Sequence, residues 1–139
     1  MEQNRLDDAI ALFTSAIDAG DRPALAMSKR GVCKVRAGDR TGAARDFAGA
    51  LDRDPKCVPA LVNLGNLALE ANMLEEARTR YEAAIKIDDR SASAHHNLGV
   101  VFRKLGRIAD SVRELRVAAS LELGPKKIVE RWKSFWSRR

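Results

Sequence analysis

The residues that could do chemistry in this 139-residue chain are few, and they do not stand at the spacings that catalysis or metal binding requires. His95 and His96 are adjacent, so on a helix they point about 100° apart rather than toward one shared ligand. The stretch from Asp52 to Pro55 lacks the glycine and the later ligands of a calcium loop. No HExxH, GxSxG or CxxC motif and no phosphate-binding glycine loop is present. We therefore expect no enzyme activity, no metal site and no cofactor.

The cysteines indicate the cellular compartment of the protein, and the apolar runs indicate whether it spans a membrane. Cys33 and Cys57 form no disulfide framework, and we interpret them as free thiols in the cytoplasm or another reducing compartment. No apolar run approaches the roughly 18 residues that a membrane span needs. The first eight residues are polar and carry acidic groups, unlike a secretory or transit peptide. We expect no transmembrane segment.

The element that positions the candidate residues is a repeat of 34 residues. Gly31, Gly65 and Gly99 are separated by this spacing, and each lies inside an apolar run of helical period. Glycine within a helix costs roughly 0.5–1 kcal/mol relative to alanine. Its recurrence at one position of the repeat predicts a place where two helices cross too closely for a side chain.

A second set of residues has the same spacing and marks the turn of each repeat. Its members, Gly38, Asn72 and Gly106, all accept the left-handed backbone conformation that ends many helices. Each repeat is therefore predicted to consist of a helix, a tight turn and a second helix.

The pattern formed by Leu64-Gly65, Ala77, Tyr81 and Ala84 resembles the tetratricopeptide repeat (TPR). The resemblance implies an all-α fold, a right-handed α-solenoid of stacked helix-turn-helix repeats. It divides the chain into a half repeat over 1–23, three full repeats over 24–57, 58–91 and 92–125, and a C-terminal helix over 126–139. Arg30 and Lys34 depart from the family pattern, because they occupy positions that are usually large and apolar.

The half repeat at the start leaves one side of helix 5–18 without its own first helix. Leu6, Ile10, Phe13 and Ile17 lie on this helix at helical spacing. One interpretation is a fragment of a longer protein, or a terminal helix that caps the stack. The other is self-association through this apolar side, because exposed apolar patches often mark interfaces.

The C-terminal segment is basic and amphipathic. Ile128, Val129, Trp132, Phe135 and Trp136 fall on one face of a helix, and Pro125 is suited to open it. We expect this helix to cap the open end of the third repeat, as terminal helices do in solenoids. The alternative is a basic amphipathic helix that binds an anionic membrane or nucleic acid.

The resemblance also implies a ligand-binding groove, because the first helices of tetratricopeptide repeats line a concave surface. The positions that project into it carry amides, cations and a few apolar side chains: Lys29, Val32, Arg36, Val62, Asn63, Asn66, Leu69, His96, Asn97, Val100, Arg103 and Lys104. Asparagine at the position of Asn63 and Asn97 often hydrogen-bonds the backbone of an extended peptide in this family, since an amide both donates and accepts. The cations favour an acidic or carboxylate-bearing segment.

One subfamily can be tested directly, because chaperone-binding domains hold a terminal carboxylate with lysines, asparagines and an arginine at fixed offsets. At four of these offsets the chain has Ser28, Val32, Ser93 and Asn97, and only Asn63 matches. The sequence disfavours binding to a chaperone tail.

Together these patterns predict a non-enzymatic adaptor that binds an extended or helical, acidic segment of a partner protein. The runner-up function is RNA binding, indicated by the net charge of +6 and the pI near 9.7. Repeat 58–91 is net acidic and would interrupt a basic track, so nucleic acid ranks second.

Overall fold

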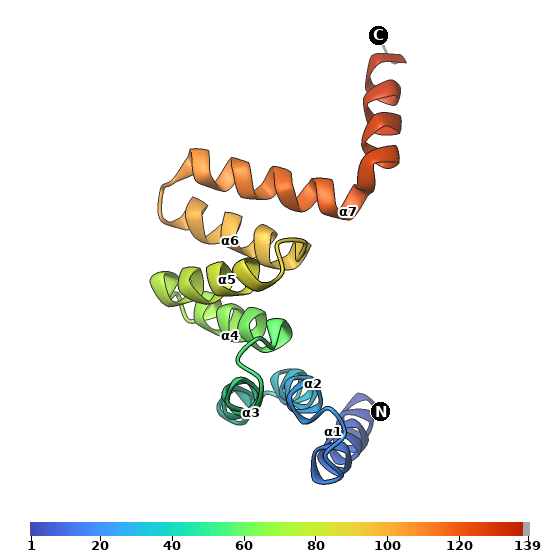
Figure 1. The fold of residues 1–139 in the computed structure, drawn as a ribbon, viewed down its shortest axis with the longest axis vertical. Coiled ribbons are helices and arrows are strands. Elements are labelled where there is room, and N and C mark those ends of the chain that lie inside the picture. Colours follow the sequence, from blue (N-terminus) through green and yellow to red (C-terminus); the bar gives the residue numbers. More distant parts are fainter. Residues whose placement is uncertain (138–139) are drawn as a thin grey trace.

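The computed structural model describes the backbone of residues 1–137 and, within it, the side chains of residues 1–123, 133–134 and 137. Over residues 1–137 it contains seven α-helices and no strand: α1 (Glu2–Asp18), α2 (Pro23–Arg36), α3 (Arg40–Arg53), α4 (Val58–Glu70), α5 (Leu74–Ile87), α6 (Ala92–Lys104) and α7 (Ile108–Ser137). The helices stack in chain order from one end of the molecule to the other, so the two termini lie at opposite ends (Figure 1). The predicted all-α solenoid is confirmed.

Each turn inside a repeat has the backbone that the sequence predicts. Gly38, Asn72 and Gly106 have positive φ angles of 88°, 59° and 78°. The backbone N–H groups of the next residues reach back to the last turn of the preceding helix, with donor–acceptor distances of 2.8 Å in all three repeats. These bonds use carbonyl groups that a helix end leaves without partners, so the turn and the helix end stabilise each other.

The recurring glycines lie where the two helices of a repeat cross. A Cβ atom added to Gly31 would lie 2.5 Å from the Phe47 ring, and one added to Gly65 would lie 2.6 Å from the Tyr81 ring. At Gly99 the nearest atom would be a Leu115 carbon at 2.8 Å. All three distances are shorter than a carbon–carbon contact, so the prediction of equivalent close crossings is confirmed.

The buried core follows the same repeat. Alanines of the second helices are fully buried beside the large side chains that meet the glycines, and two clusters result. One cluster centres on Phe47 and the other on Tyr81 and Phe102. Leu51 packs against both clusters, so the core continues from one repeat to the next as it does in stacked-repeat proteins.

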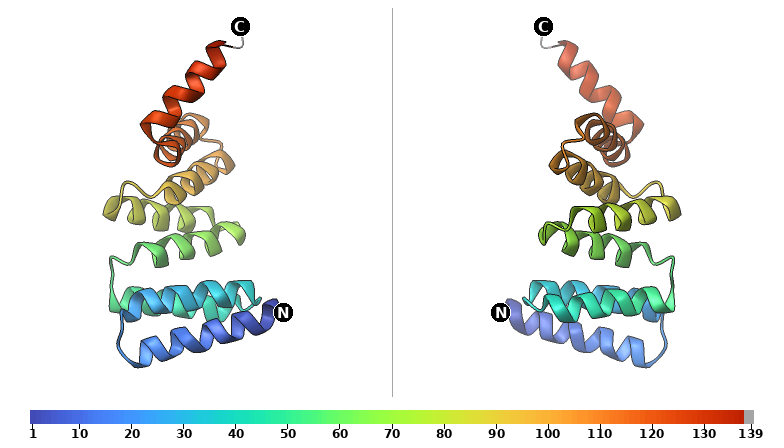
Figure 2. Two further views of the ribbon diagram at one scale, coloured as in Figure 1. Left: turned by 90° about the vertical axis from the view of Figure 1, so that its right-hand side faces the viewer. Right: turned by 90° about the vertical axis from the view of Figure 1, so that its left-hand side faces the viewer.

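The C-terminal segment differs from the prediction in one respect. A separate helix was expected from residue 126, but α7 continues through Gly124 and Pro125 to Ser137. Gly124 has no Cβ, which relieves the restriction that a proline places on the residue before it. The second half of α7 bends, as expected of a helix that contains a proline, and its last turns point away from the stack (Figures 1 and 2). The side chains of Ile128, Val129, Trp132, Phe135 and Trp136 lie outside the described ones, so capping of the third repeat stays a prediction.

Candidate functional site

The twelve predicted groove residues lie on the first helices of the three full repeats, α2, α4 and α6. These helices contact one another directly, α2 with α4 and α4 with α6. The second helices do not, since no contact joins α3 to α5 or α5 to α7 among the described residues. First helices that lie closer together than second helices make the stack curve toward them. We call the surface of α2, α4 and α6 that carries the twelve residues the inner face.

A hydrogen-bonded cluster on the inner face joins two repeats. The oxygen Oδ1 of Asn66 accepts one bond from the Tyr81 hydroxyl at 2.6 Å and another from Nδ2 of Asn97 at 2.8 Å. Tyr81 is fully buried, and this burial raises the pKa of its hydroxyl. Asn66 and Asn97 are therefore bound to their own protein, and Asn97 ties α6 to α4.

Asn63 holds the same position in its repeat as Asn97 but is bonded differently. Asn97 reaches a residue 31 positions earlier, Asn66. The residue 31 positions before Asn63 is Val32, which has no group to receive an amide proton. Among the described residues the Asn63 side chain makes no hydrogen bond. The structure thus separates two residues that the sequence pattern treats as equivalent, and the Asn63 amide makes no bond to another described residue.

The charged side chains among the twelve residues are cations, whereas Glu70, at the repeat position of Arg36 and Lys104, is an acid paired with Arg40. Lys29, Arg36, Arg103 and Lys104 are exposed, and no ion pair to them occurs among the described residues. His96 is also exposed, and its Nδ1 lies 3.2 Å from Oδ1 of Asn97. The remaining apolar members are half-buried, except for Val62, which is buried. The inner face offers exposed cations on both sides of Asn63.

The departures at Arg30 and Lys34 are explained by a carboxylate that the sequence interpretation did not single out. Asp46 on α3 accepts two bonds from the Arg30 guanidinium, at 2.7 and 2.8 Å, and lies 3.1 Å from Lys34 Nζ. Burial alone would raise the pKa of Asp46, but the bonds from Arg30 and Lys34 outweigh it and hold the pKa below its usual 3.8. Two cations and an acid at facing positions of one repeat were the signal available in the sequence. This cluster replaces an apolar contact, and its role is structural.

His95 also has a structural role. It is buried, with Nδ1 2.6 Å from Oε2 of Glu114 and Nε2 2.8 Å from the carbonyl of Asp89. A carbonyl only accepts, so Nε2 carries a proton and Nδ1 shares one with Glu114. Over the residues that the structure describes, no group of three or more His, Cys, Asp or Glu side chains could hold a metal ion.

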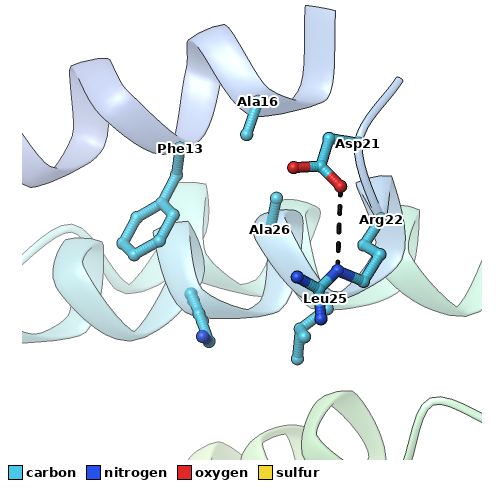
Figure 3. A pocket seen from close by; sticks show the side chains of 7 residues that line it. Phe13, Ala16, Asp21, Arg22, Leu25 and Ala26 are labelled. Atoms are coloured by element: carbon cyan, nitrogen blue, oxygen red, sulfur yellow. Dashed lines mark ion pairs between the residues drawn. The ribbon is translucent and has the colours of Figure 1, made fainter. Parts of the chain in front are cut away.

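An open pocket of about 130 Å³ lies between α1 and α2 (Figure 3). Phe13 and Ala16 of α1 form one wall, and Leu25, Ala26 and Lys29 of α2 form the other. Asp21 and Arg22, whose side chains lie 3.7 Å apart, close its end. The pocket is lined by apolar atoms on both helices, with a cation at its edge.

None of the described helices combines the length and apolar character that would be needed to cross a lipid bilayer.

Comparison with known proteins agrees with the fold. A family profile described as "Tetratricopeptide repeat" matches residues 1–56, and one described as "TPR repeat" matches residues 65–106. The structure is similar to the second TPR of Spaghetti (RPAP3) bound to the HSP90 peptide SRMEEVD, with a TM-score of 0.68 and 19% identity, over 77% of this chain and 98% of that chain. It is also similar to MamA, with a TM-score of 0.67 and 17% identity, over 86% of this chain and 79% of that chain. At these identities the likeness shows the fold alone.

A curated relative matches in sequence. The chain is 27% identical over 128 residues to a Hordeum vulgare protein described as probable UDP-N-acetylglucosamine–peptide N-acetylglucosaminyltransferase SPINDLY. The match covers 92% of this chain but 13% of the relative. The chain therefore spans about an eighth of that relative's length, and the activity named for the whole relative does not follow for it.

Proposed function

Because the chain belongs to the tetratricopeptide repeat family, we propose that it is a non-enzymatic protein-interaction scaffold whose inner face holds an acidic segment of a partner protein. The observation that carries this proposal is the free amide of Asn63. Asn66 and Asn97 are engaged by their own protein, whereas Asn63 is half-buried on the same face with no bond to another described residue. A primary amide can donate to a carbonyl and accept from an N–H of an extended backbone at once, so one such group can fix the register of a peptide.

The charge of the segment follows from the cations around Asn63. Arg36 lies at the end of α2, and Arg103 and Lys104 lie at the end of α6, all exposed. Three cations at the C-terminal ends of α2 and α6, which flank α4 and its Glu70, favour carboxylates at one end of the bound segment. The ligand is therefore expected to be an extended peptide with an acidic cluster.

A terminal carboxylate held as in chaperone-binding domains does not fit these residues. In this chain Ser28, which stands at the first lysine offset of that subfamily, is buried with 1% of its surface exposed. It can present no cation to a ligand. The neighbour whose structure contains an HSP90 peptide supports peptide binding by this fold, and the ligand of this chain is expected to differ.

A peptide library displayed on phage and selected on the full chain tests the proposal. We expect acidic peptides to be selected, Asn63→Ala to weaken them about 10-fold, and Arg103→Glu to weaken them further. Arg53→Glu is the matched control, because Arg53 is exposed at the end of α3, a second helix that lies off the inner face. Equal binding by wild type, Asn63→Ala and Arg103→Glu would exclude the inner face as the site.

The RNA and membrane alternatives depend on net charge, and the described residues add no observation in their favour. The same selected peptides can be competed with RNA at rising salt. A steep loss of RNA affinity with salt, together with no peptide selected, would reverse the order of the two functions.

A further inference from the structure

One side of α1, at the edge of its contact with α2, lacks the first helix that covers the second helix in the other repeats. In α3 and α5 the residues that face the first helix of the same repeat are at most 1% exposed: Ala43, Phe47, Ala50, Ala77, Tyr81 and Ala84. Their equivalents in α1, Ala9, Phe13 and Ala16, are partly exposed. α1 contacts only α2 among the described helices. We call this side of α1, together with the pocket of Figure 3, the open slot.

The C-terminal segment carries the apolar stripe of a first helix, in the register of the repeat. All six buried residues of α6 have counterparts 34 positions later, and five of the six counterparts are apolar, the exception being Lys133. The other five pairs are Ala94 and Ile128, His95 and Val129, Leu98 and Trp132, Val101 and Phe135, and Phe102 and Trp136. The backbone of this segment is helical and points away from its own stack (Figure 2).

We propose that residues 126–137 of one copy occupy the open slot of a second copy, so that two copies build a composite repeat head to tail. In that repeat the tail supplies the first helix and α1 of the neighbouring copy supplies the second.

The strongest support comes from the position of Leu12. In the first full repeat this position is Asp46, which binds Arg30 and Lys34 of its first helix. In the third full repeat it is Glu114, which binds His95 of its first helix. In these two repeats the side chain at this position is matched in chemistry to the first helix opposite it, whereas in the second full repeat Arg80 stands there opposite Leu61, Leu64 and Ala68.

In α1 the same position is Leu12, an apolar side chain with 71% of its surface exposed. In the tail, the positions of Arg30, Lys34 and His95 are Trp132, Trp136 and Val129, all apolar. Leu12 and these three tail residues are matched as apolar groups, just as acid and base are matched in the first and third full repeats. A largely exposed leucine would have a defined partner in the composite repeat.

The charges agree with this pairing. Residues 2–18 contain four acids and one base, whereas residues 126–139 contain six bases and one acid. The two helices of a repeat are antiparallel, because a short turn joins them. The tail would therefore bring Lys126 and Lys127 toward Asp18, and its arginines toward Glu2. Attraction between opposite charges raises the rate of association and fixes the direction of docking.

One position makes the composite contact looser than a covalent repeat. Lys133 stands where the other first helices have Gly31, Gly65 and Gly99, so it faces Phe13. A lysine cannot enter a crossing that leaves no space for a methyl group, and the helices must lie farther apart there. We therefore expect association that depends on concentration rather than a permanent complex.

Because the two surfaces are different, each copy keeps a free tail at one end and a free slot at the other. Such heterologous contacts extend beyond a dimer unless the rotation closes a ring. This property distinguishes the proposal from pairing of α1 with α1, which would stop at two copies.

Light scattering of the full chain over a range of concentrations up to about 1 mM tests the proposal. Wild type should grow beyond the mass of a dimer, whereas Leu12→Glu and Trp132→Glu alone should each associate about 100-fold more weakly, because each places a charge in an apolar contact. A mixture of Leu12→Glu and Trp132→Glu should form a dimer and stop, since one intact slot and one intact tail remain. Met73→Glu is the control, because Met73 is an apolar residue with 53% exposure in the turn between α4 and α5.

Leu12 is exposed, so Leu12→Glu should keep the melting temperature of wild type. A wild-type chain that stays monomeric throughout would overturn the proposal, and so would a mixture that stays monomeric. Loss of association in Leu12→Glu but not in Trp132→Glu would overturn it as well, because α1 would then pair with α1.

Discussion

The oxygen of Asn66 receives hydrogen bonds from two different helices, and this makes the neighbouring amides unequal. The Tyr81 hydroxyl and the Asn97 amide both donate to it, from α5 and α6 respectively. One further repeat back, the valine at position 32 offers no such acceptor to Asn63. A single exchange of asparagine for valine between successive repeats thus decides whether an inner-face amide is bonded to the preceding repeat or is left without that bond.

The two amides should respond oppositely to removal. Both Asn63→Ala and Asn97→Ala gain helix propensity, by up to about 0.7 kcal/mol. Asn97→Ala also loses a hydrogen bond between repeats, for which about 1 kcal/mol is typical. Urea unfolding should therefore show Asn63→Ala slightly more stable than wild type and Asn97→Ala less stable than Asn63→Ala by about 1 kcal/mol. Equal stability of the two variants would contradict the distinction drawn between them.

Asp46 should make the stability of the first full repeat depend on pH. Its pKa in the folded protein lies below the usual 3.8, so the unfolded state takes up its proton first as the pH falls. The stabilisation by Asp46 is complete above the usual carboxyl pKa and is lost as the pH falls toward the folded pKa. Asp46→Asn leaves Arg30 and Lys34 without their acid and should cost about 2–3 kcal/mol near neutral pH.

Urea unfolding of wild type and Asp46→Asn at neutral pH and at about pH 3 measures this effect. The difference between the two proteins should shrink at the lower pH, because protonated Asp46 no longer binds the cations as a carboxylate. Asp52→Asn is the control, since Asp52 is exposed on the same helix and pairs with no described cation. If the difference in the free energy of unfolding between wild type and Asp46→Asn were the same at both pH values, the substitution would act through a loss of packing rather than a loss of charge.

At the level of helices, the sequence was informative where one residue type has one physical reason to recur. The three glycines at the crossings and the three residues with positive φ could be placed from spacing alone. The ion-pair partner of Arg30 and Lys34 could not be predicted from spacing, because Asp46 is one of many charged residues and only the fold brings it against them. The sequence analysis also did not predict that α7 continues without interruption to Ser137. Pro125 normally opens a helix, but Gly124 before it has no Cβ to clash with the proline ring, and the helix continues with a bend.

The glycine crossings predict a contrast between two glycines. Gly65→Ala places a Cβ atom 2.6 Å from the Tyr81 ring, which is fully buried and cannot move aside. It should lower stability by about 1–3 kcal/mol, the usual cost of overpacking. Gly49→Ala places a Cβ atom 2.5 Å from the terminal methyl of Met27, a flexible side chain that can turn away. Thermal unfolding should show Gly49→Ala at or above wild-type stability, and a loss as large as that of Gly65→Ala would refute the crossing as the cause.

For the whole molecule, stability should fall from the middle of the stack toward its N-terminal end. α4 contacts four helices, α2, α3, α5 and α6, whereas α1 contacts only α2. In a linear stack each repeat is stabilised by its neighbours, so an end helix opens at a lower free energy than a central one. The open slot on α1 is therefore expected to lie at a less stable end of the described stack, where a partner would add a missing neighbour.

Hydrogen exchange measured at two protein concentrations joins these two properties in one experiment. At low concentration the amides of α1 should exchange fastest and those of α4 slowest. At high concentration the amides of α1 should become protected while those of α4 stay unchanged, because α1 acquires a new neighbour and α4 does not. Leu12→Glu should keep the low-concentration pattern at every concentration, since a charge in the slot prevents docking but leaves the contact of α1 with α2 intact. If α1 were as protected as α4 at low concentration, the end of the stack would already be stable, and the slot would have no energetic reason to bind a second copy.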